Sequence, residues 1–303
     1  MQQRRAMPKE TRTTSALRAE TIALEPGLYV VATPIGNLSD VTLRALSVLA
    51  SADLVLCEDT RVTRRLLDHY GLKPSLLAYH EHNAAAVRPR VLARLETGAA
   101  VALVSDAGTP LISDPGYKLV EAAIAAGHRV FPIPGASALL AALVAAGLPT
   151  DRFLFDGFLP AKAGQRKTRV AELATIPATL ILYESGPRLA ASLADLATAL
   201  GERPAAVCRE LTKTFEEVRR GTLDALAAHY GEAGPPKGEI VIVIGPPGGE
   251  APTVSADTLD AKLNAALTRL SLKDAVEAVT SETGLKRRDV YQRALALSSG
   301  RKK

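Results

Sequence analysis

The sequence predicts an α/β protein with two lobes, a cleft between them and a small helical segment at the C-terminal end. Nine short runs rich in apolar and β-branched residues alternate with stretches in which apolar residues recur at helical spacing. Two breaks interrupt this alternation, at 148–150 and 245–249, and the pattern after the second break is wholly helical. Strands that alternate with helices indicate βαβ units and mainly parallel sheets with helices on both faces.

The first lobe is predicted over residues 25–148, after a basic extension at 1–24 that we expect to be disordered. Its expected strands are 28–33, 53–57, 75–79, 100–105 and 129–133, and its expected helices include 41–49 and 115–126. The second lobe is predicted over residues 149–249, with strands at 153–159, 179–183, 205–209 and 239–244 and a helix at 188–200. The Gly-Pro-Pro-Gly-Gly linker at 245–249 ends this lobe because it continues neither a strand nor a helix.

The tail, residues 255–303, is predicted to be helical. Leu259, Leu263 and Leu267 recur every four residues, and two further apolar series follow on either side of Gly284. Two short helices joined through a glycine, with Lys286-Arg287-Arg288 opening the second, resemble a helix-turn-helix. A helical pair that caps the body explains the same spacing equally well.

Length and composition narrow the class of protein. A chain of 303 residues suits two lobes and an appendage, and no apolar run reaches the ~18 residues of a membrane span. Because the N-terminus also lacks a stretch of signal-peptide length, we expect a cytoplasmic protein. Cys57 and Cys208 each end an apolar run, so buried reduced thiols are expected rather than a disulfide or metal ligands.

The positive charge is concentrated at the two ends of the chain. Residues 1–24 carry 5 basic and 2 acidic side chains (+3), and residues 255–303 carry 10 and 6 (+4). Since the whole chain carries 37 and 32, residues 25–254 carry 22 and 24 (−2). Basic ends of this kind neutralise RNA phosphates or serve solubility, and charge alone favours neither.

Three loops at predicted strand ends have the composition of a ligand site. They are residues 33–37, 105–110 with 114–116, and 134–138, and ligands of parallel α/β sheets bind outside the carboxyl ends of strands. Glycines and prolines there let the backbone approach a ligand, and Ser105 and Asp106 suit a ribose or an amino-acid head group. Neither a Gly-x-x-x-x-Gly-Lys-Ser/Thr loop nor a Gly-x-Gly-x-x-Gly loop is in place, so a nucleoside-like ligand is favoured over phosphate-rich cofactors.

A second group of polar residues also follows predicted strands. Glu58-Asp59-Thr60-Arg61, His80-Glu81-His82-Asn83 and Arg209-Glu210-Leu211-Thr212-Lys213 come from both lobes. They offer carboxylates or an imidazole as proton acceptor, and Arg or Lys for phosphate. Two alternatives remain: Glu58 and Arg61 form a structural ion pair, or His80 and His82 bind a metal. No third ligand at metal spacing accompanies the histidines, so no metal is expected.

As a set, these motifs resemble the tetrapyrrole methylase superfamily, specifically its branch of bacterial ribosomal RNA small-subunit methyltransferase I. The resemblance covers about residues 27–245, and the tail fits as well. It is carried by Thr-Pro-Ile-Gly-Asn-Leu at 33–38, Glu-Asp-Thr-Arg at 58–61, Ser-Asp-Ala-Gly-Thr-Pro at 105–110, Asp-Pro-Gly at 114–116, Gly-Phe-Leu-Pro at 157–160, Tyr-Glu-Ser at 183–185 and Arg-Glu-Leu-Thr-Lys at 209–213. Many relatives have a histidine before the arginine that follows Tyr-Glu-Ser, where this chain has Pro187.

The resemblance implies an enzyme that transfers a methyl group from S-adenosylmethionine to the 2′-hydroxyl of a cytidine in the decoding region of small-subunit ribosomal RNA. Carried over by motif and adjoining residue, the cofactor-binding residues are Pro34, Ser105, Asp106, Ala107, Gly108, Ser137, Ala138, Tyr183, Glu184 and Leu211. The expected catalytic group is Glu58 or Asp59 as proton acceptor, with His80 as a substitute and Arg61 and Lys213 on phosphates.

The expected partners are small-subunit ribosomal RNA or the assembled 30S subunit, and a second copy of the chain in a homodimer. Two other functions remain open: a corrin or tetrapyrrole ring methylase of the same fold, and a non-catalytic RNA-binding protein that uses the basic ends.

Overall fold

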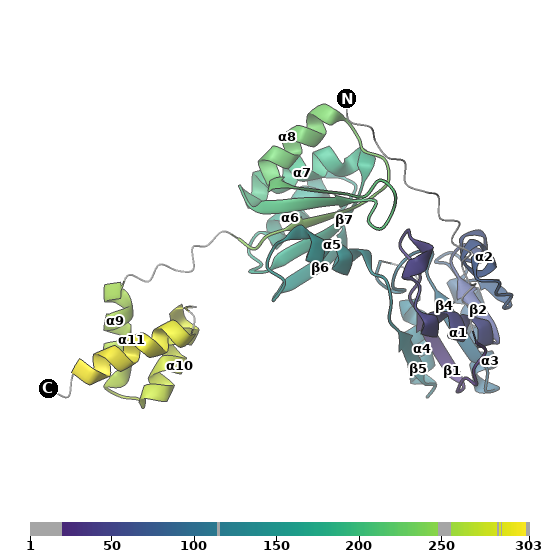
Figure 1. The fold of residues 1–303 in the computed structure, drawn as a ribbon, viewed down its shortest axis with the longest axis horizontal. Coiled ribbons are helices and arrows are strands. Elements are labelled where there is room, and N and C mark those ends of the chain that lie inside the picture. Colours follow the sequence, from purple (N-terminus) through teal and green to yellow (C-terminus); the bar gives the residue numbers. More distant parts are fainter. Residues whose placement is uncertain (1–19, 114–115, 248–255, 284, 286, 301–303) are drawn as a thin grey trace, which may run out of the picture. The chain divides into compact units, whose positions relative to one another are not determined.

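The computed structural model describes residues 20–113, 116–247, 256–283, 285 and 287–300 (Figure 1). Several sequence predictions lie outside these residues. They concern residues 1–19 of the expected disordered extension, Asp114 and Pro115 of the Asp-Pro-Gly motif, 248–249 of the linker, and Gly284 and Lys286 of the tail. Within the described part of the chain, no helix combines the length and the apolar character needed to cross a membrane.

The first sheet is wholly parallel, with strand order β3-β2-β4-β1-β5. Its strands are β1 (Gly27–Val31), β2 (Leu54–Cys57), β3 (Leu76–Ala78), β4 (Ala100–Val104) and β5 (Val130–Ile133), which confirms the predicted runs. Helices α1 (Leu43–Ser51) and α2 (Thr60–His69) cover one face, and α3 (Ala84–Glu96) and α4 (Tyr117–Ala125) cover the other. Successive residues point to opposite faces, so Val55 and Cys57 pack with α1 and α2, while Leu54 and Leu56 pack with α3 and α4.

The second sheet is mixed, with strand order β6-β7-β10-β8-β9. Only β6 (Phe153–Phe158) and β7 (Thr179–Ser185) pair in parallel; β10 (Glu239–Ile244) runs antiparallel to β7 and to β8 (Pro204–Arg209), and β9 (Glu217–Thr222) runs antiparallel to β8. The prediction of mainly parallel sheets is therefore wrong for this lobe. The apolar run of β10 is buried on both faces, and the sequence of such a run does not show whether the strand pairs in parallel or antiparallel.

Helices cover both faces of the second sheet. Helices α6 (Ala163–Leu173), α7 (Gly186–Leu200) and α8 (Leu223–Ala233) pack on one face. Helix α5 (Ala138–Ala146) follows the last strand of the first sheet, yet it packs on the other face of the second sheet through Leu139, Ala142 and Leu143. Through its apolar face, α5 therefore connects the first sheet to the core of the second. The lobe boundary at 148–149 remains a prediction.

Residues 247–303 form a separate compact unit, distinct from residues 1–246. Its helices are α9 (Ala256–Leu267), α10 (Leu272–Thr283) and α11 (Arg287–Gly300), one more than the helix-turn-helix pair requires. They enclose a small apolar core that includes Leu263, Val276 and Val290. Arg293 of α11 donates to both carboxylate oxygens of Asp260 on α9, at 2.6 and 2.5 Å, so side chains as well as the core join the helices.

Candidate functional site

A cavity of about 370 Å³ lies among the strand-end loops of the two sheets. The second-lobe wall includes the start of β10, because this antiparallel strand begins where β7 and β8 end. The first lobe contributes Ile35, Asp106, Ala107, Gly108, Thr109, Ile112, Ser113, Ser137 and Ala138, and the second contributes Phe158, Tyr183, Glu184, Ser185, Cys208, Leu211, Gly238, Glu239, Ile240 and Val241. A cavity of this size and mixed polarity suits a small organic ligand.

Hydrogen bonds fix the shape of the glycine loop on the first-lobe side. Thr33 and Gly108 exchange two backbone hydrogen bonds, Thr33 N to Gly108 O at 2.9 Å and Gly108 N to Thr33 O at 3.0 Å. The Ser105 hydroxyl donates to the Gly108 carbonyl at 3.1 Å. Gly108 has a φ of 81°, and a β-carbon there would lie 3.3 Å from Ile35 Cγ2, so the loop needs glycine at this point.

A buried carboxylate, Glu184, lies on the second-lobe side. Glu184 is 3% exposed. Its Oε2 accepts from the Ser192 hydroxyl at 2.5 Å, and its Oε1 accepts from the Ser185 backbone N–H at 2.8 Å. Arg188 Nε lies 3.4 Å from Oε1. These partners, the Ser185 N–H and two side chains of α7, hold the buried carboxylate in place at the end of β7.

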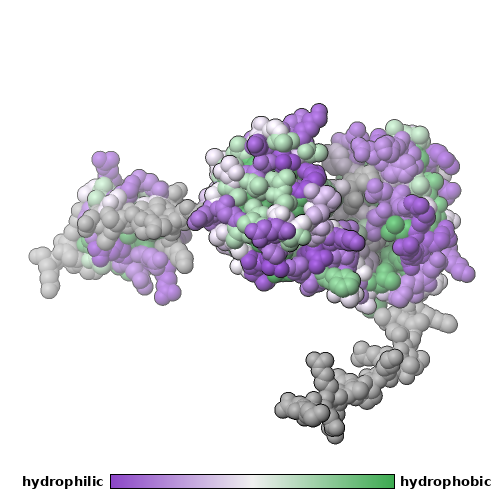
Figure 2. Space-filling model, turned by 90° about the horizontal axis from the view of Figure 1, so that it is seen from above, coloured by the Kyte–Doolittle hydropathy of each residue, from purple (hydrophilic) through white to green (hydrophobic). Residues whose placement is uncertain are grey.

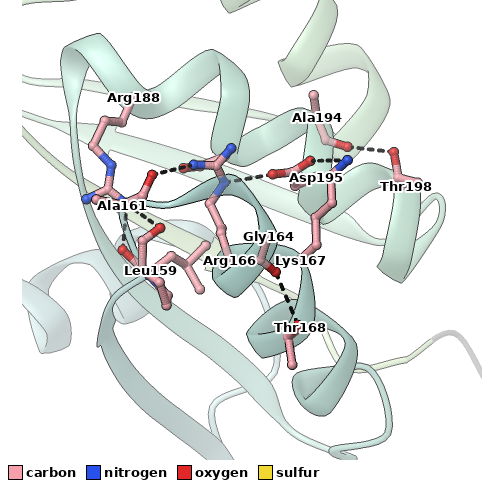
Figure 3. Close-up of polar contacts among 12 residues, drawn as sticks. Leu159, Ala161, Gly164, Arg166, Lys167, Thr168, Arg188, Ala194, Asp195 and Thr198 are labelled. Atoms are coloured by element: carbon pink, nitrogen blue, oxygen red, sulfur yellow. Dashed lines mark hydrogen bonds and ion pairs between the residues drawn. The ribbon is translucent and has the colours of Figure 1, made fainter.

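Two arginines clamp the loop that follows β6 (Figure 3). Arg188 Nη2 donates to the carbonyls of Leu159 at 2.5 Å and Pro160 at 3.3 Å, and Arg166 Nη1 donates to the carbonyl of Ala161 at 3.4 Å. Arg166 also pairs with Asp195, Nε to Oδ2 at 2.7 Å. Three successive carbonyls are thus held in place directly after Phe158, which lines the cavity.

A close approach between the lobes lies beside the cavity. The Asn37 N–H donates to the Thr212 hydroxyl at 3.1 Å, and a β-carbon on Gly36 would overlap the Lys213 side chain. Glu210 and Thr212 adopt left-handed φ values of 49° and 67°, which non-glycine residues rarely do. Backbone strain of this kind persists where the surrounding contacts fix it.

The structure brings most of the predicted cofactor-binding residues to one cavity. Asp106, Ala107, Gly108, Ser137, Ala138, Tyr183, Glu184 and Leu211 line it, although they come from four separate segments of the chain. Pro34 and Ser105 are buried and are not among the lining residues. The Ser105 hydroxyl is directed to the carbonyls of its own loop, so its contribution there is to the shape of the loop.

The predicted catalytic residues lie next to the cavity rather than on its wall. Asp59 is the N-cap of α2: its Oδ1 accepts from the Arg61 N–H at 2.8 Å, and its carboxylate pairs with the Arg61 guanidinium at 2.6 Å. These hydrogen bonds lower the pKa of Asp59 to about 2. The Asp59 N–H in turn donates to Asp106 Oδ1 at 3.0 Å, which joins this segment to the cavity wall.

Glu58 has different surroundings. Burial, with the nearby charge of Asp106, raises the pKa of Glu58, and the charge of His80 opposes this rise. Burial also raises the pKa of Asp106 itself. His80 Nδ1 is buried without a hydrogen-bond partner among the described residues. The ends of β2, β3 and β4 thus hold two carboxyl groups with raised proton affinity and one imidazole.

Lys213 lies between two carboxylates. Its Nζ is 2.8 Å from Glu210 Oε1 and 2.8 Å from Glu239 Oε2. Glu239 lines the cavity and Lys213 does not, so Lys213 is linked to the cavity wall through Glu239. Among the residues that the structure describes, no group of three or more His, Cys, Asp or Glu side chains is arranged to hold a metal ion.

Sequence reasoning missed the contribution of β10 and of the loop before it. Gly238 precedes β10, and Glu239, Ile240 and Val241 begin it; all four line the cavity, whereas the loops predicted to bind a ligand follow strands. Phe158, in the Gly-Phe-Leu-Pro motif at 157–160, also lines the cavity, although it was not among the predicted cofactor-binding residues. The sequence offers one signal of this close approach, the glycine at 238 directly before the strand. Gly238 has a φ of 102°, and a β-carbon there would overlap the Glu210 side chain.

Comparison with known proteins identifies the family. A family model described as Tetrapyrrole (Corrin/Porphyrin) Methylases matches residues 27–227. A second model, described as RsmI C-terminal HTH domain, matches residues 253–298. The first match covers the first sheet and strands β6 to β9 of the second and ends within helix α8, before β10; the second match covers the helical tail.

Curated proteins match over most of the chain. A ribosomal RNA small subunit methyltransferase I of Mesorhizobium japonicum is 56% identical over 275 residues, covering 90% of this chain and 93% of its own. The protein of that name from Pseudomonas aeruginosa is 47% identical over 274 residues, covering 88% of this chain and 96% of its own.

Solved structures share the fold. A uroporphyrin-III-C-methyltransferase from Thermus thermophilus has a TM-score of 0.53 and 25% identity, covering 73% of this chain and 94% of its own. Another structure of that description from Thermus thermophilus, complexed with S-adenyl homocysteine, has a TM-score of 0.51 and 21% identity, covering 72% and 96%. These methyltransferases therefore share the fold of this chain.

Proposed function

The chain belongs to the tetrapyrrole methylase family, in the branch of ribosomal RNA small subunit methyltransferase I, and we propose that it methylates the 2′-hydroxyl of a cytidine in the decoding region of small-subunit RNA. The methyl donor is S-adenosylmethionine. The observation that carries this proposal is the cavity, on which eight predicted cofactor-binding residues from four segments converge.

The cavity fits this donor in chemistry as well as in size. Ile35, Leu211 and Val241 offer apolar surface for an adenine ring, and the tight turn at Gly108 leaves room that a side chain would fill. Asp106 offers a carboxylate to ribose hydroxyls, an amino group or the positive sulfonium. When bound, S-adenosylmethionine supplies an electrophilic methyl group. The residues of the chain then need to align a ribose hydroxyl with it and accept the proton.

Glu58 is the proposed proton acceptor. A base works best when its pKa approaches the working pH, and burial raises the pKa of Glu58. Asp59 is a weaker base because side-chain and backbone hydrogen bonds from Arg61 lower the pKa of its carboxyl to about 2. His80 lies close enough to favour the ionised form of Glu58, so we assign it a supporting role.

The proposed phosphate contacts are Arg61 and Lys213. Arg61 is 88% exposed and pairs with a single carboxylate, so it can bind a phosphate without leaving a buried charge. Lys213 first has to release Glu210 or Glu239.

We also propose that the tail binds RNA, that two copies form a dimer and that the protein acts in the cytoplasm. Leu140 and Val144, 50% and 76% exposed on one face of α5, support the dimer.

The test is nucleoside analysis of small-subunit RNA from cells with and without this protein. RNA from cells that lack it should contain unmodified cytidine where the parental RNA contains 2′-O-methylcytidine. Uroporphyrinogen III serves as the control substrate, because methylation of that ring with no change in the RNA assigns the cavity to a corrin or porphyrin substrate.

A further inference from the structure

One edge of the first lobe concentrates the positive charge of the body. Residues 60–96, from the start of α2 to the end of α3, carry seven basic and three acidic side chains (+4). Since residues 25–254 carry 22 and 24, the rest of the body carries 15 and 21 (−6). The seven basic residues, which we call the basic edge, are Arg61, Arg64, Arg65, Lys73, Arg88, Arg90 and Arg94.

The basic edge is accessible and largely unneutralised. Six of its seven residues are exposed, and Arg88 is half-buried. Among the described residues, only Arg61 of the seven has an ion pair, with Asp59. The second lobe differs: there Arg166, Arg169, Arg188, Arg209 and Arg219 each pair with a carboxylate. In Figure 2 the first lobe, on the right, shows an extensive hydrophilic surface.

The spacing of these charges works against the helices that carry them. Arg61 and Arg65 are four residues apart on α2, and Arg90 and Arg94 are four residues apart on α3. Like charges at this spacing destabilise a helix, and a cation in the first turn opposes the helix dipole. Helix stability therefore does not account for the arrangement, whereas an anionic partner would offset the repulsion.

The basic edge is continuous with the catalytic side of the first lobe. Strand β3 is the edge strand of its sheet, and α2 and α3 flank it on opposite faces. Helix α2 begins at Thr60, directly after Glu58 and Asp59, and the Asp59 N–H bonds to Asp106 on the cavity wall. A polyanion bound along α2 thus lies close to Glu58, the proposed proton acceptor, and to the cavity wall at Asp106.

We infer that the basic edge binds the phosphate backbone of the RNA substrate and leads the target nucleotide to the cavity. This inference rests on the proposed function, which supplies an RNA substrate. Guanidinium groups suit the task because their planar forks bind phosphate oxygens in pairs. The basic edge binds the charged RNA backbone, so it contributes affinity and positions the RNA but does not select bases.

The test compares Arg65→Gln/Arg94→Gln with Lys118→Gln/Arg152→Gln in the full chain. Each variant removes two exposed basic residues, but the control pair lies outside the basic edge. The first variant also removes one member of each repulsive pair, so folding should be unimpaired. Affinity for purified small-subunit RNA and for 30S subunits is measured against salt, together with affinity for S-adenosylhomocysteine.

The first variant should bind RNA more weakly and lower the slope of log affinity against log salt by about 1.4–1.8, since each phosphate contact contributes about 0.7–0.9. Its S-adenosylhomocysteine affinity should be unchanged, and Arg65→Lys/Arg94→Lys should restore RNA binding. An equal loss in the control variant, or an unchanged slope, overturns the inference. Loss of binding to phosphatidylserine vesicles with intact RNA binding also overturns it. The proposed function fails separately, if the parental protein methylates neither RNA nor 30S subunits.

Discussion

At the residue scale, the choice between Glu58 and Asp59 decides how the hydroxyl loses its proton. The structure separates two adjacent carboxylates that the sequence left as equals: Asp59 caps α2 and binds Arg61, whereas Glu58 lies close to Asp106 and His80. Sequence spacing alone does not show this difference, because it depends on where β2 ends and α2 begins. Adjacent residues at such a junction point into different surroundings.

Glu58→Gln should lower the single-turnover methylation rate by about 100-fold or more at saturating RNA, the scale of a general base. Asp59→Asn should lower it far less, since Asp59 bonds to Arg61 and the helix N-terminus. The parental rate should rise with pH through a pKa above the ordinary carboxyl value and then level off, because Glu58 accepts a proton only when ionised. An Asp59→Asn variant with the larger defect would reverse the assignment.

Gly108 offers a test of the cofactor wall. Gly108→Val should abolish S-adenosylmethionine binding in calorimetry, because the side chain would stand on the cavity wall. Gly127→Val is a matched control: Gly127 has the same φ of 81°, and a β-carbon there meets nothing within 4 Å. Both variants carry backbone strain, but only Gly108→Val should lose the cofactor. Equal cofactor loss in both would mean that strain, not the cavity, is responsible.

At the element scale, the arginine clamp on the β6–α6 loop is a device that the sequence did not reveal. Arg188 is the arginine that follows the Tyr-Glu-Ser motif, and no role was predicted for it, because its partners Leu159, Pro160 and Glu184 are brought together by pairing of β6 with β7. Strand β9 escaped prediction for a related reason. Its Glu-Val-Arg-Arg-Gly-Thr sequence is that of a polar edge strand, which lacks the apolar signal of a buried one.

Arg188→Met should lower the free energy of unfolding by roughly 3 kcal/mol, since it leaves the Glu184 carboxylate buried with fewer partners. Adding Glu184→Gln to this variant should recover part of the loss, because no unpaired charge then remains. Arg188→Lys keeps the charge but reaches fewer carbonyls, so its free energy of unfolding should lie between those of the parental protein and Arg188→Met. Urea unfolding measures each value. Additive losses in the double variant would show that the two side chains are not coupled.

At the scale of the whole molecule, the alternation of strands and helices was enough to predict the two lobes, and the motifs were enough to predict which loops meet. The direction of β10 and the packing of α5 on the second sheet were not predictable. A run of buried apolar residues shows neither the direction of a strand nor which sheet a helix packs against. As a result, the cavity wall formed by the start of β10 was found only in the structure.

Deleting residues 255–303 should weaken RNA binding and flatten its salt dependence, because the tail carries 10 basic and 6 acidic residues. The tail encloses its own apolar core, so S-adenosylmethionine affinity and the melting temperature of the body should be retained. Calorimetry and salt-dependent binding curves measure the two effects. Unchanged RNA binding in the truncated chain would leave the tail a structural role only.

The most direct test of the whole account is the position of a labelled methyl group in the product. The full chain is incubated with 30S subunits and methyl-labelled S-adenosylmethionine, and the RNA is digested to nucleosides for mass spectrometry. The account predicts that the label appears in 2′-O-methylcytidine and that Glu58→Gln loses nearly all of it. Label on a nucleobase, or on the ribose of another nucleotide, would contradict the proposed reaction.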